Sequence, residues 1–163
     1  MRELTTPLSD EDISSLEVGD KIYISGTIYT GRDAALPQLV SLVENGSVPF
    51  DLKGSVIMHT AFSDAGIAPT TSSKVEIESS IKPLSQAGIK IHIGKGMLSD
   101  DSVRALDEHN SIFVITPPVA ALLTSKVTDR KCVLFEDEGM EAMFRLNVDR
   151  IPGIVAIAKG EKI

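Results

Sequence analysis

The chain has 163 residues, of which 42% are hydrophobic and 24% are charged, and its formal net charge is -7. This length and composition are typical of one globular domain, residues 1–163. The acidic balance argues against nucleic acid as the main partner, because nucleic-acid-binding domains carry basic surfaces. No apolar run approaches the roughly 18 residues of a membrane span, and the polar start has no signal-peptide core, so we expect a cytoplasmic protein.

Beyond residues 1–20, which we expect to be an arm or docking segment, strand and helix patterns alternate along the chain. Apolar and β-branched runs predict six strands, at residues 21–29, 55–61, 89–93, 111–116, 131–137 and 153–158. Helical spacing predicts helices at residues 35–46, 75–88, 99–110, 119–127 and 139–148. Ser99 is a candidate N-cap. The alternation predicts an α/β fold with a layered, substantially parallel sheet.

Three short motifs each follow a predicted strand and precede a predicted helix. They are TGRDAAL (residues 30–36), PTTSSK (residues 69–74) and IGKGMLSDD (residues 93–101). Ligands of open α/β sheets bind beyond the carboxyl ends of the strands. Helix N-termini at that edge attract anions through their backbone N–H groups and partial positive charge.

The first motif offers a guanidinium to an anion. Gly31 would allow a tight turn, and Arg32 could bind a carboxylate or phosphate through two hydrogen bonds. Asp33 could cap the helix or orient Arg32. The alternative is an ordinary Asp N-cap beside a surface arginine.

The second and third motifs combine hydroxyls, glycines and lysines. Thr70 and Thr71 could donate hydrogen bonds to carboxylate oxygens beside Lys74, although turns rich in Ser and Thr also cap helices. Two glycines flank Lys95 and would let a ligand approach the backbone, although an exposed lysine in a glycine turn is the simpler alternative. With Arg32, these lysines indicate a site for a small anion such as a dicarboxylate.

The potential metal ligands are few. The single Cys132 cannot hold a metal cluster by itself, and the three histidines show no metal-ligand spacing. His92 alternates with an isoleucine face, which indicates contact with solvent or a helix rather than catalysis. Cys132 is expected to be a core residue of a strand, and Glu141 lies near a predicted helix start, where carboxylates are favourable.

In their order, the segments SGTIYTGRDAAL, APTTSSK, IGKGM, EDEGMEAMFRLNV and IPGIVAIAKG resemble the β subunit, or C-terminal domain, of class I (iron–sulfur) fumarate hydratases and their tartrate dehydratase relatives. The resemblance covers roughly residues 18–160 and implies a swivelling β/β/α domain. It further implies a hetero-oligomer in which a partner α subunit carries a 4Fe–4S cluster and this chain binds no cofactor. The family reaction is the reversible hydration of fumarate to L-malate. Because the cluster would lie on the partner subunit, the resemblance implies that this chain is inactive alone.

The resemblance also implies roles for individual residues. Arg32 matches the carboxylate-binding arginine of the GRD motif, and Lys95 matches the substrate-contacting lysine of the GKG motif. Thr70 matches the threonine that contacts substrate and is suggested to abstract the proton, with Thr71 and Lys74 completing the substrate-binding set. A threonine hydroxyl is a weak base and would need a charged neighbour, which we expect from the partner subunit.

Several positions depart from the family pattern. Leu36 stands where the family has histidine, and Lys74 stands where it has arginine, which replaces a bidentate contact by a point charge. The substrate therefore stays open between fumarate, tartrate, mesaconate and another hydroxy-dicarboxylate. A non-catalytic dicarboxylate-binding subunit is the second hypothesis. Phosphate or nucleotide binding through Lys95 is the third, which the absence of a GxxxxGK[ST] motif disfavours.

Overall fold

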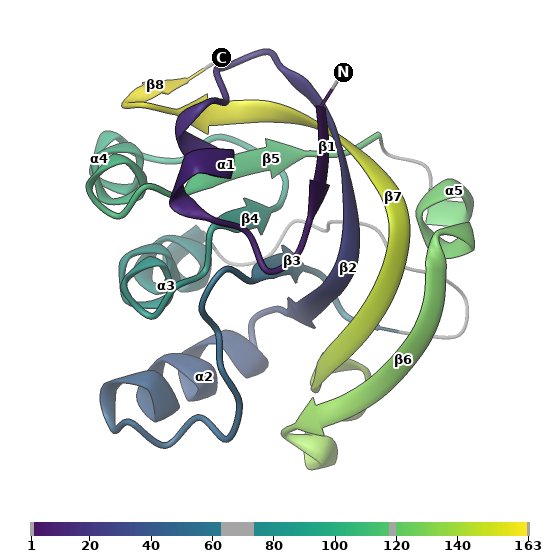
Figure 1. The fold of residues 1–163 in the computed structure, drawn as a ribbon. Helices are drawn as coiled ribbons and strands as arrows, with labels where there is room; N and C mark the ends of the chain where they lie inside the picture. Colours follow the sequence, from purple (N-terminus) through teal and green to yellow (C-terminus); the bar gives the residue numbers. More distant parts are fainter. Residues whose placement is uncertain (1, 63–73, 118–119, 163) are drawn as a thin grey trace.

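A computed structural model describes residues 2–62, 74–117 and 120–162, and of residues 74–76 and 120–121 it describes the backbone alone. In chain order the elements are β1 (Arg2–Thr5), α1 (Asp10–Ser14), β2 (Lys21–Gly31), α2 (Ala35–Glu44), β3 (Val56–His59), α3 (Lys74–Gln86), β4 (Ile91–Ile93), α4 (Asp100–Glu108), β5 (Ile112–Ile115), α5 (Ala120–Ser125), β6 (Val127–Leu134), the 3-10 helix η1 (Glu136–Glu141), β7 (Met143–Ala158) and β8 (Glu161–Lys162) (Figure 1). No helix in these described ranges is long and apolar enough to cross a membrane.

The sheet closes on itself. Strands β1 to β5 are each parallel to the next in the order β1-β2-β3-β4-β5. Strand β7 is antiparallel to both β5 and β2, so the path β2-β3-β4-β5-β7 returns to β2. Strands β6 and β8 pair with β7 outside this ring. The α/β fold with a mixed, substantially parallel sheet is therefore confirmed.

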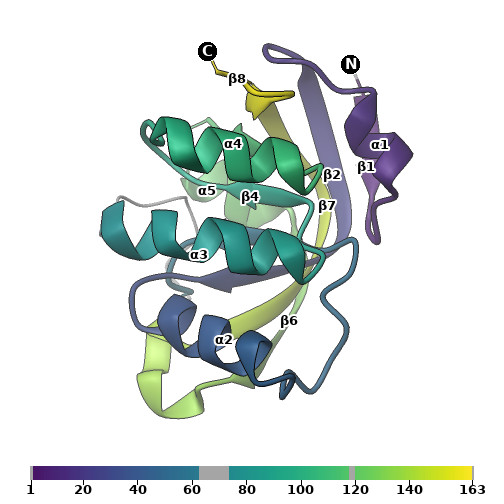
Figure 2. The same cartoon turned by 90° about the vertical axis from the view of Figure 1, so that its left-hand side faces the viewer.

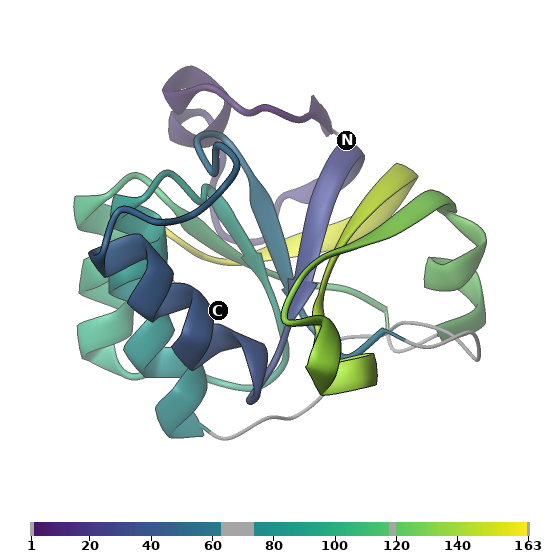
Figure 3. The same ribbon diagram turned by 90° about the horizontal axis from the view of Figure 1, so that it is seen from below.

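Side chains alternate between the two faces of these strands. The domain therefore has three layers: a core inside the ring, the sheet itself, and helices outside it. Val56, Met58, Ile91, Ile93 and other residues of the ring strands point inward and form a buried apolar core. The intervening residues point outward, where helices α2, α3 and α4 lie side by side over one face of the sheet (Figures 2 and 3).

The first residues of the chain belong to this fold. β1 extends the sheet beside β2, and α1 buries Ile13 in the core inside the ring. Ser9 caps α1 through a capping box with Asp12, in which each side chain accepts a hydrogen bond from the other residue's backbone N–H. A docking role for this segment stays a prediction.

The helix predicted at residues 139–148 is wrong. η1 ends at Glu141, and β7 begins at Met143 and continues to Ala158. Residues 143–148 pair with β6 on one side and with β2 on the other. The spacing of Met140, Met143 and Phe144 is helix-like. The segment forms a strand instead, because two neighbouring strands provide a ladder of backbone hydrogen bonds.

Candidate functional site

The motifs that carry Arg32 and Lys95 leave one edge of the sheet. Because β2, β3 and β4 are parallel neighbours, their carboxyl ends at Gly31, His59 and Ile93 lie in a row. Arg32 directly follows β2, and the motif with Lys95 directly follows β4. At about 4.8 Å between neighbouring strands, the ends of β2 and β4 are about 10 Å apart. The long side chains of an arginine and a lysine can close around one small dianion across that span.

The second motif lies in the connection between β3 and α3. Thr70 and Thr71 fall outside the described residues, so their predicted roles stay predictions. Lys74 is the first residue of α3, and its side chain is not described.

Arg32 forms an ion pair with Glu141 that the sequence analysis did not anticipate. Arg32 Nε donates to Glu141 Oε1 at 3.3 Å, and a second guanidinium nitrogen donates to Glu141 Oε2. The two side chains are 29% and 25% exposed. η1 brings Glu141 to the carboxyl end of β2 across 109 residues. The carboxylate orients the guanidinium plane and leaves part of it accessible to a ligand.

Two details around Arg32 differ from the predictions. Gly31 has no positive φ, so it does not serve the tight turn that was expected of it. Helix α2 begins at Ala35, and its N-cap Ala34 makes no side-chain cap bond, so Asp33 is not the N-cap. Leu36, at the family's histidine position, is fully buried between α2 and the sheet.

The GKG turn is built tightly against the sheet. The Gly94 N–H donates to the Val114 carbonyl at 3.1 Å. A Cβ on Gly94 would lie 2.8 Å from Phe113 Cζ, so only glycine fits this position without a shift. Gly96 has a φ of +88°, which favours glycine. The exposed Lys95 lies between them, directly after the packed Gly94 at the strand-end edge.

Helices α3 and α4 are joined behind this turn. Ser99 caps α4, as predicted, by accepting the Ser102 N–H at 3.3 Å. Glu78 of α3 accepts hydrogen bonds from the Ser99 N–H and from Ser102 Oγ. These bonds fix the α4 N-terminus next to the motif that carries Lys95.

A cavity of about 570 Å³ is lined by residues of β6, η1 and β7, including Met140, which precedes Glu141 in the sequence. Phe62, Phe144 and Met140 contribute its apolar wall, and the Phe62 N–H donates to the Met140 carbonyl at 2.9 Å, next to Glu141. The volume lies within the range of about 300–1,000 Å³ of small-molecule pockets. Cys132 also lines this cavity and is only partly buried, so the expectation of a core residue is wrong: among the described strands, residues of β6 pair with β7 on one side only and stay partly accessible. Its partial burial, together with the charge of Glu136, raises the pKa of the thiol, which favours the protonated form near neutral pH.

A pair of buried histidines lies behind the edge, on the helix side of the sheet. His92 is fully buried, and its Nε2 lies 2.9 Å from Ser85 Oγ of α3, which confirms the expected helix contact. His59 is also fully buried, and neither ring nitrogen has a hydrogen-bond partner among the described residues. Burial lowers the pKa of His59 to about 4 and lowers the pKa of His92 well below its ordinary value. Both rings are neutral at physiological pH. Within the described ranges, no three His, Cys, Asp or Glu side chains form a metal site.

Comparisons with known proteins identify a family and several relatives of this chain. Residues 2–163 match the family model described as "Fumarase C-terminus". The chain is 32% identical over 165 residues to the "Putative L(+)-tartrate dehydratase subunit beta" of Methanocaldococcus jannaschii, covering 92% of this chain and 84% of that protein. It is 30% identical over 131 residues to the "L(+)-tartrate dehydratase subunit beta" of Escherichia coli K12, covering 75% of this chain and 64% of that protein.

A third relative is longer. The "Putative fumarate hydratase class I" of Geobacillus stearothermophilus is 32% identical over 122 residues, which cover 68% of this chain but only 23% of that protein. The match to the Escherichia coli subunit likewise spans slightly less than two thirds of that protein's length. Because the family model covers nearly the whole chain, this protein belongs to the fumarase C-terminus family, with β subunits of tartrate dehydratase among its relatives.

Proposed function

We propose that this chain is the β subunit of an iron–sulfur hydro-lyase that catalyses the reversible hydration of fumarate to L-malate. One observation carries the proposal: the motifs with Arg32 and Lys95 directly follow the carboxyl ends of β2 and β4, which flank β3 in the parallel sheet. Parallel strand ends and adjoining helix N-termini form the usual ligand-binding edge of α/β sheets. The cationic side chains Arg32 and Lys95 suit a substrate with two carboxylates.

The cluster is proposed to reside on a partner α subunit. One cysteine in the whole sequence cannot supply the thiolates that hold a 4Fe–4S cluster. The words "subunit beta" in the names of two relatives support the existence of a second subunit. The contribution of this chain is then to bind, orient and enclose the substrate.

In this proposal, each residue has a separate task. Arg32 binds one substrate carboxylate through its guanidinium, which Glu141 holds in place, and Lys95 neutralises the other carboxylate. Thr71 and Lys74, both of the PTTSSK motif, contact the substrate as well. The Thr70 hydroxyl takes the proton from the carbon next to a carboxylate, helped by a charged group of the α subunit because a threonine alone is a weak base.

The test uses the assembled enzyme. The chain is co-expressed with the candidate α subunit, the cluster is reconstituted without oxygen, and fumarate formation from L-malate is followed by ultraviolet absorbance. We expect turnover only when both chains are present. Thr70→Ala should lower kcat by about 100-fold or more, and Arg32→Gln should mainly raise KM.

Arg104→Gln is the matched control. Arg104 makes the same type of ion pair, with Asp101 on the exposed face of α4. Its substitution removes the same charge and should leave kcat and KM unchanged. If the reconstituted complex is silent with L-malate, the fumarase assignment is refuted. If Thr70→Ala retains full turnover, the catalytic role proposed for Thr70 is refuted.

Tartrate dehydration is the second candidate, because two relatives carry that name. Loss of water from L-tartrate gives the enol of oxaloacetate, which a coupled reduction by NADH detects. A higher kcat/KM for L-tartrate than for L-malate would establish this activity instead. Silence with both substrates in a complex with an intact cluster would favour a non-catalytic dicarboxylate-binding subunit.

A further inference from the structure

A second, polar cavity of about 500 Å³ lies where β2 changes its neighbour. β1 pairs with residues 22–25 of β2, and β3 pairs with residues 29–31. Among the described strands, residues 26–28 therefore have no partner on that side. The polar wall comes from β2, from β7 and from the segment before β3, and includes Thr27, Tyr29, Lys53, Ser55, Arg145 and Asn147.

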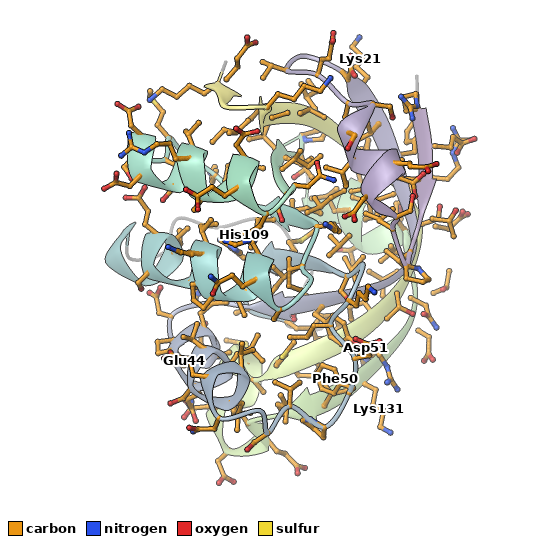
Figure 4. All side chains as sticks on the ribbon, turned by 60° about the vertical axis from the view of Figure 1, so that its left-hand side comes forward. Lys21, Glu44, Phe50, Asp51, His109 and Lys131 are labelled. Carbon is orange, nitrogen blue, oxygen red and sulfur yellow. The ribbon has the colours of Figure 1, made fainter. Side chains whose placement is uncertain are left out.

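Arg145 lies beside a stacked aromatic pair in this cavity. Tyr29 is opposite Arg145 in the β2–β7 ladder, so the two side chains lie on the same face of the sheet. The Tyr29 ring is stacked on Phe50, with 5.0 Å between ring centroids and 9° between the ring planes. Figure 4 shows Phe50 and the neighbouring Asp51 on the connection between α2 and β3. The stacking fixes the Tyr29 ring next to Arg145.

The hydrogen-bond donors around Arg145 are suited to an anion. Burial raises the pKa of Tyr29, so the phenol stays protonated and can donate its O–H. Thr27 Oγ1 donates to Asn147 Oδ1 at 3.0 Å, which leaves the amide N–H groups of Asn147 available to a ligand. The donors outnumber the acceptors on this wall.

Two cations line the cavity without a carboxylate partner. In the described part of the chain, neither Arg145 nor Lys53 has a carboxylate oxygen within ion-pair distance. Asp51 contributes the only described carboxylate of the lining, and its Oδ1 accepts the backbone N–H of Lys53 at 2.9 Å. In a chain with a net charge of -7, this is a local concentration of positive charge.

We propose that this cavity binds a small oxyanion, a carboxylate or phosphate group of a metabolite, between Arg145 and Lys53. The guanidinium fork matches two oxygens of either group, and the lysine supplies a second point charge. The volume is sufficient for a small metabolite.

The site is separate from the strand-end edge described above. Ser55 precedes β3, whereas the strand-end edge lies at His59, the last residue of β3, and four residues of strand span about 13 Å. The proposal therefore does not depend on the hydratase assignment.

The test is calorimetric titration of the full chain, and of its complex with the α subunit, with inorganic phosphate and with succinate as separate probes. We expect saturable binding of at least one probe, weakened tenfold or more by both Arg145→Gln and Lys53→Gln. Phosphate binding would identify a phosphate-bearing ligand, and succinate binding would identify a carboxylate. Lys53 is exposed, so Lys53→Gln should keep the fold even if Arg145→Gln does not, and thermal unfolding of each variant verifies this.

Two controls remove the same charge elsewhere. Arg104→Gln should leave the binding of both probes unchanged. Arg32→Gln should leave unchanged the component of binding that Lys53→Gln weakens, even if succinate also binds at the strand-end edge. The proposal would be overturned if neither probe showed saturable binding up to about 10 mM. At that concentration, only affinities weaker than millimolar would escape detection. Binding that Arg32→Gln abolishes and Lys53→Gln preserves would also overturn it, by placing the anion at the strand-end edge.

Discussion

Substitution of Gly94 by alanine should destabilise the protein through one contact. An added Cβ would lie 2.8 Å from Phe113 Cζ and 3.0 Å from Phe113 Cε1, and 3.4 Å from His59 Nδ1. Phe113 is 1% exposed and is packed among residues of α3, α4 and β7, so its ring has little room to move. Gly94 has no positive φ, so the backbone itself would accept alanine.

The change in the free energy of unfolding of Gly94→Ala follows from two opposing contributions. Overpacking of a core costs about 1–3 kcal/mol. Replacing glycine by alanine in an acceptable backbone conformation returns about 0.4–1 kcal/mol through the lower entropy of the unfolded chain. The net loss of unfolding free energy lies between about 0 and 2.6 kcal/mol, with a midpoint of about 1.3 kcal/mol. For a domain of this size, a loss of about 1.3 kcal/mol lowers Tm by about 3–5 °C.

Urea denaturation of Gly94→Ala and of a matched variant, Gly31→Ala, measures the effect. A Cβ on Gly31 would meet Ala35 Cβ at 3.5 Å and Leu36 Cδ2 at 3.6 Å, which are ordinary contacts. Gly31→Ala should therefore be as stable as the wild type or more stable by up to about 1 kcal/mol. Phe113→Leu should cost less in the Gly94→Ala background than alone, because the smaller side chain relieves the overlap.

Equal stability of Gly94→Ala and Gly31→Ala would refute this reasoning. Additivity of Gly94→Ala and Phe113→Leu would show that the loss, if observed, arises elsewhere.

Three further predictions concern the histidines, the α2 core and the Arg32 ion pair. The pKa of His59 is lowered by burial to about 4, so the unfolded chain binds the proton more readily. Stability should be constant above about pH 6.5 and fall by about 3 kcal/mol towards pH 4, and denaturation of His59→Gln across this range should show a smaller slope. Leu36→His, which restores the family residue, should cost about 2 kcal/mol or more because Leu36 is fully buried; thermal unfolding at unchanged Tm would contradict this. Glu141→Gln should change unfolding free energy by less than about 1 kcal/mol, since the ion pair is partly exposed, but should alter KM for the dicarboxylate, and an unchanged KM would exclude Glu141 from positioning Arg32.

The sequence by itself determined most of the elements and the order of the motifs. Each of the six predicted strands overlaps an observed strand, because alternating apolar residues indicate locally which side of a strand is buried. The strand predicted at residues 131–137 is displaced, since β6 spans Val127–Leu134 and η1 begins at Glu136. Ser99 could also be identified as a cap from the sequence, because a cap bond is local and joins residues three positions apart. The motif series also sufficed to identify the family, which the match over residues 2–163 confirms.

Only the tertiary structure decided contacts between distant segments. Residues 143–148 became strand rather than helix because β2 and β6 were both available as partners, and no local pattern reports such neighbours. The Arg32–Glu141 pair joins residues 109 positions apart, and the second cavity joins β2, β7 and the segment before β3. These features depend on how the sheet closes and in which register its strands pair, and both are set by the packing of the whole core rather than by neighbouring residues.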